Sequence, residues 1–388
     1  MKKLSGVLFL FFLFNCEKTE EIPVIKAGLP VIRITTENKA PISSREVYQP
    51  ASLNLDGDKP FSGDIEIRGR GNSTWGFPKK PFKIKLEEKI GLLNALPAKK
   101  WVLLANYLDP SLMQNAVAMK IGHLLQMPFT NTIEPIELWL NNEYMGNYML
   151  TEQVEAKKNR VDASVLLSLD TGIEPDENHF KSNFYKLPVI IKHPEEINDP
   201  RLDAIEQDFN ELEERINSSD FPDNNYLELF DGEQMAKYLI VYTLTCNEEI
   251  NHPKSTYIHK KKVGKFTMGP IWDFDWAFSF EQNQVHYVNP RRPLFWERDT
   301  KGKTFFKRIA SDPKIRALIK RQWQVFRSND FNELMAFVDS YADSIEASRQ
   351  ADFKKWRRGE ADFSLEKEAL KNWLVLRASY MDDLVKEY

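Results

Sequence analysis

The amino-acid sequence predicts an α+β protein with a sheet-rich N-terminal lobe, residues 27–155, and a mostly helical C-terminal lobe, residues 156–388. Two patterns predict it. From about residue 30, apolar residues alternate with polar ones as in half-buried strands, whereas beyond about residue 200 they recur at helical spacing. The 388 residues, of which 42% are hydrophobic, are enough to bury a core in each lobe. Two lobes leave a cleft between them, where a ligand site is expected.

The first lobe is predicted to contain strands, one helix and a hairpin. Residues 111–127 have the apolar spacing of an amphipathic helix, with Ser111 as the N-cap. Residues 133–154 read as a β-hairpin that turns either at Asn141–Asn142 or at Gly146. Period-two alternation predicts three further strands, LPVIRITT (29–36), GDIEIRGRG (63–71) and KPFKIKLEE (80–88).

The second lobe is predicted to be mostly helical, with one pair of strands. The segment GPIWDFDWAF, residues 269–278, reads as a strand that pairs with residues 255–261. Helical periodicity predicts the helices of this lobe at residues 200–217, 231–246, 303–328, 330–351 and 364–388.

The first residues resemble an export signal. MKKLSGVLFLFFLFNC has two lysines, an apolar run and then Cys16, as in the lipobox of bacterial lipoproteins. We therefore expect a signal peptide at 1–15, lipidation of Cys16, and a tether at 16–26. This predicts a lipid-anchored protein of the cell envelope, in the outer membrane, facing the periplasm or the outside. Ordinary signal cleavage is the alternative.

Composition excludes several function classes. A formal net charge of -4 argues against a nucleic-acid-binding protein, which would be basic. With only two cysteines, Cys16 and Cys246, zinc-finger, CxxC and Cys-His protease chemistry are excluded. Cys246 is expected to be a small buried hydrophobe.

Two aspartates stand in a very apolar run at WDFDW. In a strand, Trp272, Phe274 and Trp276 would share one face and Asp273 and Asp275 the other. Neighbouring like charges repel, so either the face is solvated or a cation binds there. Carboxylates and amides suit Mg²⁺, and the polar loop NEEIN, with Glu249 and Asn251, supplies further oxygen ligands. A plain solvated turn is the alternative for this loop.

Two segments of the first lobe are candidates for binding phosphate. RGRGNSTW brings Gly69 and Gly71, whose backbone N–H groups can approach a ligand closely, although an ordinary hairpin turn is the commoner reason for such a pattern. The following strand carries Lys83 and Lys85 on its polar face, where they either pair with phosphate oxygens or are ordinary surface lysines.

The order of these segments resembles that of a protein kinase, and four blocks resemble the CotH family of kinase-like proteins, named for a spore-coat protein. The resemblance runs from about residue 30 to 385. It is carried by IRGRGNSTWGFPKKPFKIKL, KKWVLLANYLDPSLMQNAVA, NYMLTEQVEAKKNRV and GPIWDFDWAF.

The resemblance implies an atypical protein-kinase-like two-lobed fold that uses ATP and a divalent metal, Mg²⁺ or Mn²⁺, to phosphorylate protein hydroxyls. By this resemblance Asp273 would bind the metal and Asp275 would support it. Glu249 would accept the proton of the substrate hydroxyl. Three positions depart from the family pattern: Glu249 replaces aspartate, Ser255 replaces asparagine, and Ser279 replaces glycine. The helix at 111–127 has no glutamate to pair with a strand lysine, so Glu152 or Glu155 is expected to substitute.

Two other functions remain open on the sequence alone. An exported kinase faces a compartment with no obvious ATP supply, and the departures at Glu249 and Ser255 would suit a pseudokinase that acts as a surface binding or scaffold protein. A glycan-handling surface protein is the second alternative, suggested by an aromatic content of 12%, although aromatic residues more often form core.

Overall fold

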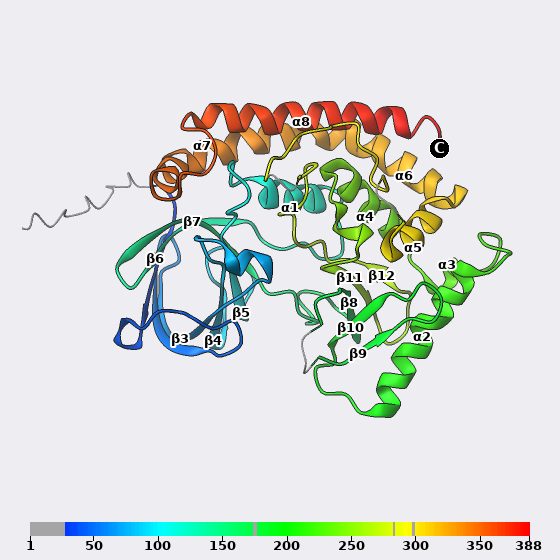
Figure 1. The fold of residues 1–388 in the computed structure, drawn as a ribbon, viewed down its shortest axis with the longest axis horizontal. Helices are drawn as coiled ribbons and strands as arrows, with labels where there is room; N and C mark the ends of the chain where they lie inside the picture. The colour runs from blue at the N-terminus through cyan, green and yellow to red at the C-terminus, as the bar shows by residue number, and fades with distance from the viewer. Residues whose placement is uncertain (1–27, 174–176, 282–283, 297–298) are drawn as a thin grey trace, which may run out of the picture.

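The computed structural model describes residues 28–173, 177–281, 284–296 and 299–388. The expected signal peptide, the tether and Cys16 lie outside these residues. Within them the chain is a mixed α+β protein with a sheet-rich N-terminal region and a helical C-terminal region, as predicted (Figure 1). Among the described residues, no helix has both the length and the apolar character that crossing a membrane requires.

The N-terminal region is a closed seven-stranded β-barrel, in the order β1-β2-β3-β4-β5-β7-β6. Strand β1 closes it by pairing in parallel with β6. Alternate residues such as Ile32, Ile34, Ile65 and Ile67 point inward and are buried, which confirms the predicted period-two pattern. The strands are β1 (Val31–Thr36), β2 (Gln49–Asp56), β3 (Phe61–Gly69), β4 (Phe82–Ile90), β5 (Ala98–Leu104), β6 (Glu134–Leu140) and β7 (Glu143–Glu152).

The β6–β7 hairpin and helix α1 (Gln114–Leu124) form as predicted, but the helix cap differs. The hairpin turns at Asn141–Asn142, both with left-handed φ, while Gly146 lies within β7. The expected N-cap at Ser111 is wrong, because the Asp109 carboxylate accepts the Ser111 and Gln114 N–H groups, at 2.9 and 2.7 Å. A charged acceptor two residues earlier satisfies these free donors instead.

A second sheet, in the order β12-β11-β8-β10-β9, follows the barrel. The expected strand at 269–278 is wrong: β12 ends at Met268, and Asp273 has a left-handed φ of 64°, which no strand accommodates. Residues 255–261 instead pair with β8 and β12. The strands are β8 (Val165–Leu169), β9 (His179–Lys181), β10 (Pro188–His193), β11 (Thr256–Lys260) and β12 (Thr267–Met268).

The remaining regular structure is helical, close to the predicted ranges, and the described residues between β12 and α5 form loops. The expected helix at 303–328 is two helices, because the Asp312 carboxylate caps a new start at Pro313. The α-helices are α2 (Asp199–Asn217), α3 (Tyr226–Leu229), α4 (Gly232–Thr245), α5 (Lys301–Ala310), α6 (Pro313–Val325), α7 (Phe331–Trp356) and α8 (Phe363–Leu384). Short helical turns are η1 (Glu37–Lys39), η2 (Ser73–Gly76), η3 (Glu248–Asn251) and the π-turn η4 (Phe326–Asp330).

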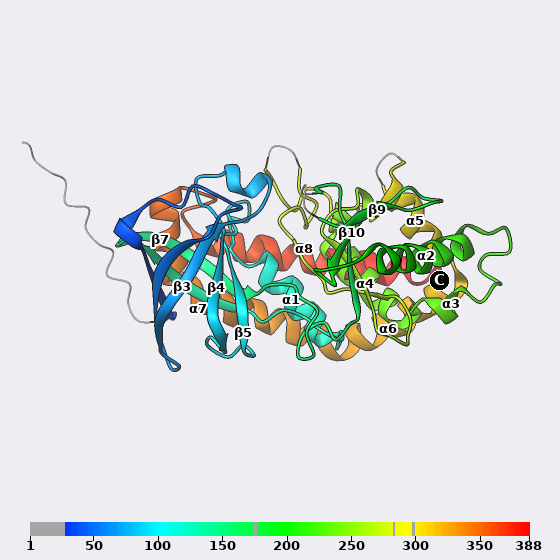
Figure 2. The ribbon, with the colours of Figure 1, turned by 90° about the horizontal axis from the view of Figure 1, so that it is seen from below.

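The buried apolar residues form two cores. One fills the barrel, and the larger one joins the second sheet to the helices. Helix α1 lies between barrel strands in sequence, yet its Val117, Met119 and Ile121 belong to the larger core. Helix α7 packs against β7 of the barrel and against α1, and α8 packs on α7 and α4 (Figures 1 and 2). They therefore hold the barrel beside the loops that follow α4 and β12.

Candidate active site

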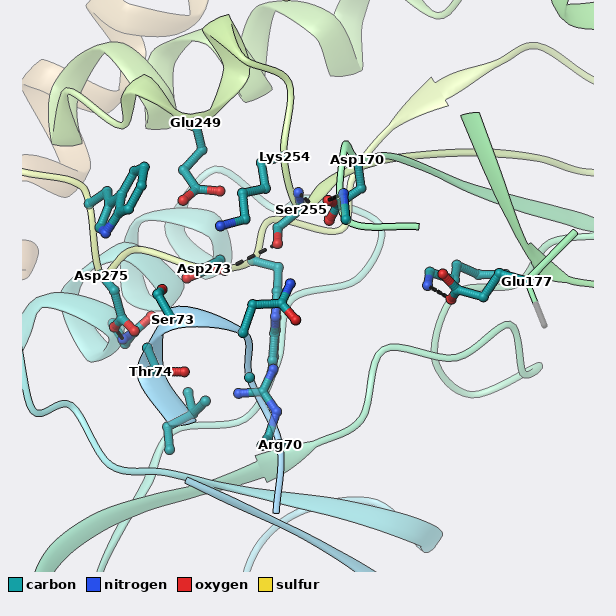
Figure 3. A pocket seen from close by; sticks show the side chains of 18 residues that line it. Arg70, Ser73, Thr74, Asp170, Glu177, Glu249, Lys254, Ser255, Asp273 and Asp275 are labelled. Carbon is teal, nitrogen blue, oxygen red and sulfur yellow. Dashed lines mark hydrogen bonds and ion pairs between the residues drawn. The ribbon is translucent and has the colours of Figure 1, made fainter. Parts of the chain in front are cut away.

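A cavity of about 210 Å³ lies where the barrel meets the second sheet and the loop after α4. In Figure 3, Arg70, Ser73 and Thr74 approach it from one side and Glu249 and Lys254 from the opposite side. The lining comes from the turn after β3 (70–74), the start of α1, the end of β8, the loop from 249 to 255, and the segment from 272 to 276.

Asp273 and Asp275 lie between these two sides, each held by one neutral side chain. The Ser255 hydroxyl donates to Asp273 Oδ2 at 3.1 Å, and Asn115 Nδ2 of α1 donates to Asp275 Oδ1 at 3.2 Å. The Asn247 side chain also donates to the Asp273 carbonyl at 2.9 Å. Both carboxylates thus enter one cavity, although they are not on a strand.

The negative charge at this point is poorly compensated. Burial, followed by the neighbouring Asp273 charge, raises the pKa of Asp275 to about 7. Glu249 is only 4% exposed, and among the described residues no donor reaches its Oε2. Burial and then Asp273 raise the pKa of Glu249 well above its ordinary value. A bound cation would relieve this repulsion.

Two cations face the carboxylates without forming ion pairs. Arg70 lies over the Trp272 ring at 5.5 Å, and Lys254 lies over the Trp276 ring at 5.0 Å. Within the described part of the chain, no carboxylate lies within ion-pair distance of either, and no acceptor takes a hydrogen bond from the Arg70 guanidinium. Burial lowers the pKa of Arg70, while the Asp273 charge raises it. Donors without acceptors in a cavity suit an anionic ligand.

A second cavity, of about 360 Å³, adjoins the first and shares Glu177 and Lys192 with it. Those two side chains form an ion pair. The second cavity is lined by Lys83 and by residues 153–157, which belong to the connection from β7 to β8. Burial, and then the nearby charge of Arg68, lower the pKa of Lys83 to about 8. Lys83 is therefore another cation without a carboxylate partner among the described residues.

The family model for the CotH kinase protein matches residues 67–381. The chain belongs to the CotH kinase family. The resemblance found in the sequence is thereby confirmed, and the chain is a kinase-like protein. No curated protein matches this chain.

Among the residues that the CotH resemblance or the residue patterns had singled out, the first cavity is lined by Asp273, Asp275, Glu249 and Gly71. Gly71 has a φ of 82°, and a Cβ there would lie 2.0 Å from Thr74 Oγ1, so the turn requires glycine. Ser255 also lies here. Residues 269–278 do not form the expected strand. Asp273 and Asp275 nevertheless line the same cavity as Glu249 of the polar loop and Ser255.

The other predicted residues lie elsewhere. A Cβ at Gly69 would lie 2.3 Å from the Trp75 ring, so this glycine serves close packing. Lys83 lies in the second cavity, whereas Lys85 is at the surface and pairs with Glu66 at 2.6 Å. Glu152 is buried and accepts from Thr132 N at 2.8 Å, while Glu155 pairs with Lys100 and Arg160. Asn251 is buried, donates to the Leu294 carbonyl at 2.8 Å, and does not line the cavity.

Sequence reasoning missed Arg70, Lys254, Asp170 and Asn115. An arginine between two glycines, in RGRG, was a usable signal, because a turn that approaches a ligand carries its neighbouring side chain with it. Asn115 had no such signal. It links α1 directly to Asp275.

The donor set is compatible with a divalent metal. Within the described residues, no three His, Cys, Asp or Glu side chains converge on a common metal position. Mg²⁺ commonly uses only one or two protein carboxylates and takes its other ligands from water and phosphate. Asp273 and Asp275, short of hydrogen bonds and crowded by Glu249, fit that pattern.

Proposed function

We propose that this CotH-family protein is an ATP-dependent and divalent-metal-dependent kinase that phosphorylates hydroxyl groups of proteins. One observation carries the proposal: two carboxylates and two cations without ion-pair partners, Arg70 and Lys254, share a single cavity with the buried carboxyl of Glu249. A bound cation would reduce the repulsion between the carboxylates, and a bound anion would pair with Arg70 and Lys254. A metal-bound polyphosphate supplies both.

Asp273 and Asp275 would hold Mg²⁺ or Mn²⁺, and Ser255 and Asn115 orient their oxygens. When bound, the metal would neutralise charge on the phosphate oxygens. Arg70 and Lys254 would bind phosphate oxygens from opposite sides of the cavity. The second cavity, with Lys83 and the 153–157 connection, would take the remainder of the nucleotide.

Glu249 would accept the proton of the attacking hydroxyl. Its side chain lines the same cavity as Asp273 and Asp275, and its Oε2 has no hydrogen-bond donor among the described residues. Burial and the Asp273 charge raise the pKa of this carboxyl, so a bound cation that offsets the Asp273 charge would favour the ionised form that accepts the proton. Glutamate reaches one methylene further than the aspartate of the family pattern, so the acceptor hydroxyl would lie correspondingly further from the backbone.

Ligand-induced stabilisation tests the proposal. ATP with Mg²⁺ or Mn²⁺ at a hundred times its Kd should stabilise the wild type by about 2.7 kcal/mol. Asp273→Asn should abolish that shift and any phosphotransfer. It should leave the ligand-free protein no less stable, because neutralising one of two repelling charges relieves strain. A variant that loses about 1–3 kcal/mol without ligand, yet keeps its full ligand shift, would identify Asp273 as a structural residue.

A pseudokinase is the second candidate, favoured by Glu249 and Ser255 at positions where the family pattern has aspartate and asparagine. It predicts the same ligand shift in the wild type but no transfer of the γ-phosphoryl group to protein hydroxyls. Incubation with γ-labelled ATP separates the two. Whether it is a kinase or a pseudokinase, we propose that the protein is held in the cell envelope by a lipid on Cys16. Its substrate or partner would then be an exported protein.

A further inference from the structure

Asp170 lies at the end of β8 and lines the first cavity, but it is neither a proposed metal ligand nor the proposed base. Each of its carboxylate oxygens accepts a backbone N–H group. Oδ1 accepts from Gly172 at 2.8 Å, and Oδ2 accepts from Ser255 at 3.0 Å. Both oxygens thus act on the backbone, and one of those contacts reaches the loop that carries Glu249.

Ser255 has a left-handed φ of 47°, which a residue with a Cβ adopts only where its surroundings hold it. The contact from Asp170 supplies part of that hold. In this conformation the Ser255 hydroxyl points at Asp273 Oδ2, 3.1 Å away (Figure 3). Asp273 itself has a left-handed φ of 64°. Two unusual backbone conformations are therefore joined by one side-chain hydrogen bond.

We propose that Asp170 is a positioning residue for the metal-binding carboxylate: it fixes Ser255, and Ser255 fixes the orientation of Asp273. This inference rests on the proposed function, because it concerns the cation that Asp273 would hold. Groups that orient a metal ligand commonly change metal affinity by 10-fold to 100-fold when they are removed. The second sheet thereby contributes to the site, although it supplies no proposed metal ligand.

The chemistry requires a carboxylate at this position. An asparagine offers one acceptor oxygen, and its NH₂ group would face the second backbone N–H. Asp170→Asn therefore keeps the size of the side chain but releases either Gly172 or Ser255. Asp162→Asn is a matched control, because Asp162 precedes the other end of β8, is exposed, and pairs only with Lys261 at 2.6 Å among the described residues.

The experiment measures Mn²⁺ affinity of the full chain at a fixed ATP concentration, by the electron paramagnetic resonance signal of free Mn²⁺. The proteins are wild type, Asp170→Ala, Asp170→Asn, Ser255→Ala, the double variant Asp170→Ala with Ser255→Ala, and the Asp162→Asn control. Each single variant should weaken Mn²⁺ binding about tenfold. The double variant should be no weaker than the weaker single variant, because both changes break the same connection. The control should bind as wild type does.

Several outcomes would overturn the inference. An Asp170→Ala variant with wild-type Mn²⁺ affinity would do so, because alanine offers neither N–H group an acceptor, as would a double variant whose loss is the product of the two single losses. Melting curves without metal exclude simple unfolding: a loss of affinity that only mirrors a lower melting temperature also counts against positioning. If wild type binds no Mn²⁺ with ATP, the proposed function itself fails. If wild type binds and the two changes do not couple, only the role of Asp170 fails.

Discussion

Two buried groups of charges in this protein differ in how completely they are paired. At the contact between the barrel and α7, Lys79 is 1% exposed, and its Nζ lies 2.6 Å from both Asp352 Oδ2 and the Asn147 carbonyl. Asp352 also accepts the Asn147 N–H at 2.9 Å. In the cavity, Arg70 and Lys254 have no such partners among the described residues, and Glu249 has an oxygen without a donor.

The difference separates a structural role from a proposed functional one. Lys79 and Asp352 connect the barrel to a helix of the C-terminal region, and the charges satisfy each other inside the protein. The cavity charges are opposite in sign but do not form ion pairs with one another, so we expect a bound ligand to compensate them. Burial alone would not have distinguished the two groups. The presence or absence of a partner does.

The largest effect is expected at the structural pair. Lys79→Met removes one partner and leaves the Asp352 charge buried without compensation, which should lower the free energy of unfolding by about 3–5 kcal/mol. Arg70→Met, by contrast, should change it by less than about 1 kcal/mol, because no internal partner is lost. Urea unfolding of the ligand-free proteins compares them. Similar losses in both variants would show that Arg70 is also structural.

The second prediction sharpens the comparison within one strand. Lys83 and Lys85 both lie on β4, but only Lys83 lines a cavity and only Lys85 has a carboxylate partner, Glu66. Lys83→Met should weaken ATP binding about tenfold, which corresponds to about 1.4 kcal/mol. Lys85→Met should leave ATP binding unchanged and serves as the matched control. Calorimetric titration with ATP and Mg²⁺ measures both, and equal affinities in the two variants would remove the second cavity from the site.

The smallest effect concerns pH. In the metal-free folded protein the pKa of Asp275 is raised from 3.8 to about 7, so the folded state keeps a proton that the unfolded state has already released. Stability should therefore fall as the pH rises from about 4 to 7. Asp275→Asn should remove this loss, so the variant gains on wild type by about 1 kcal/mol more at pH 8 than at pH 5, a value reduced because the residue retains some solvent exposure. Thermal unfolding at both pH values tests it, and a gain independent of pH contradicts it.

Much of the fold was predictable because local spacing determines it. The barrel strands alternate with a clear period, the Asn141–Asn142 turn suits left-handed φ, and the helices lie near their predicted ranges, apart from the one that Pro313 divides into α5 and α6. The strand at 269–278 was wrongly predicted, because alternating burial survives there without any strand hydrogen bonding: Trp272 and Phe274 are still buried. Closure of the barrel was not predictable, since β1 pairs with β6 across most of the lobe and periodicity does not identify partners.

The sequence by itself determined the family, the α+β class, and the presence of Asp273, Asp275 and Glu249 in polar segments of an apolar region. These follow from residue order and local periodicity. Only the tertiary structure decided which charges are paired. Four basic residues lie within one short stretch of sequence, yet their surroundings differ. Lys79 pairs with Asp352 of α7, Lys85 pairs with Glu66 at the surface, and Arg70 and Lys83 line cavities. A charge finds its partner through contacts between distant segments, and no local pattern encodes them.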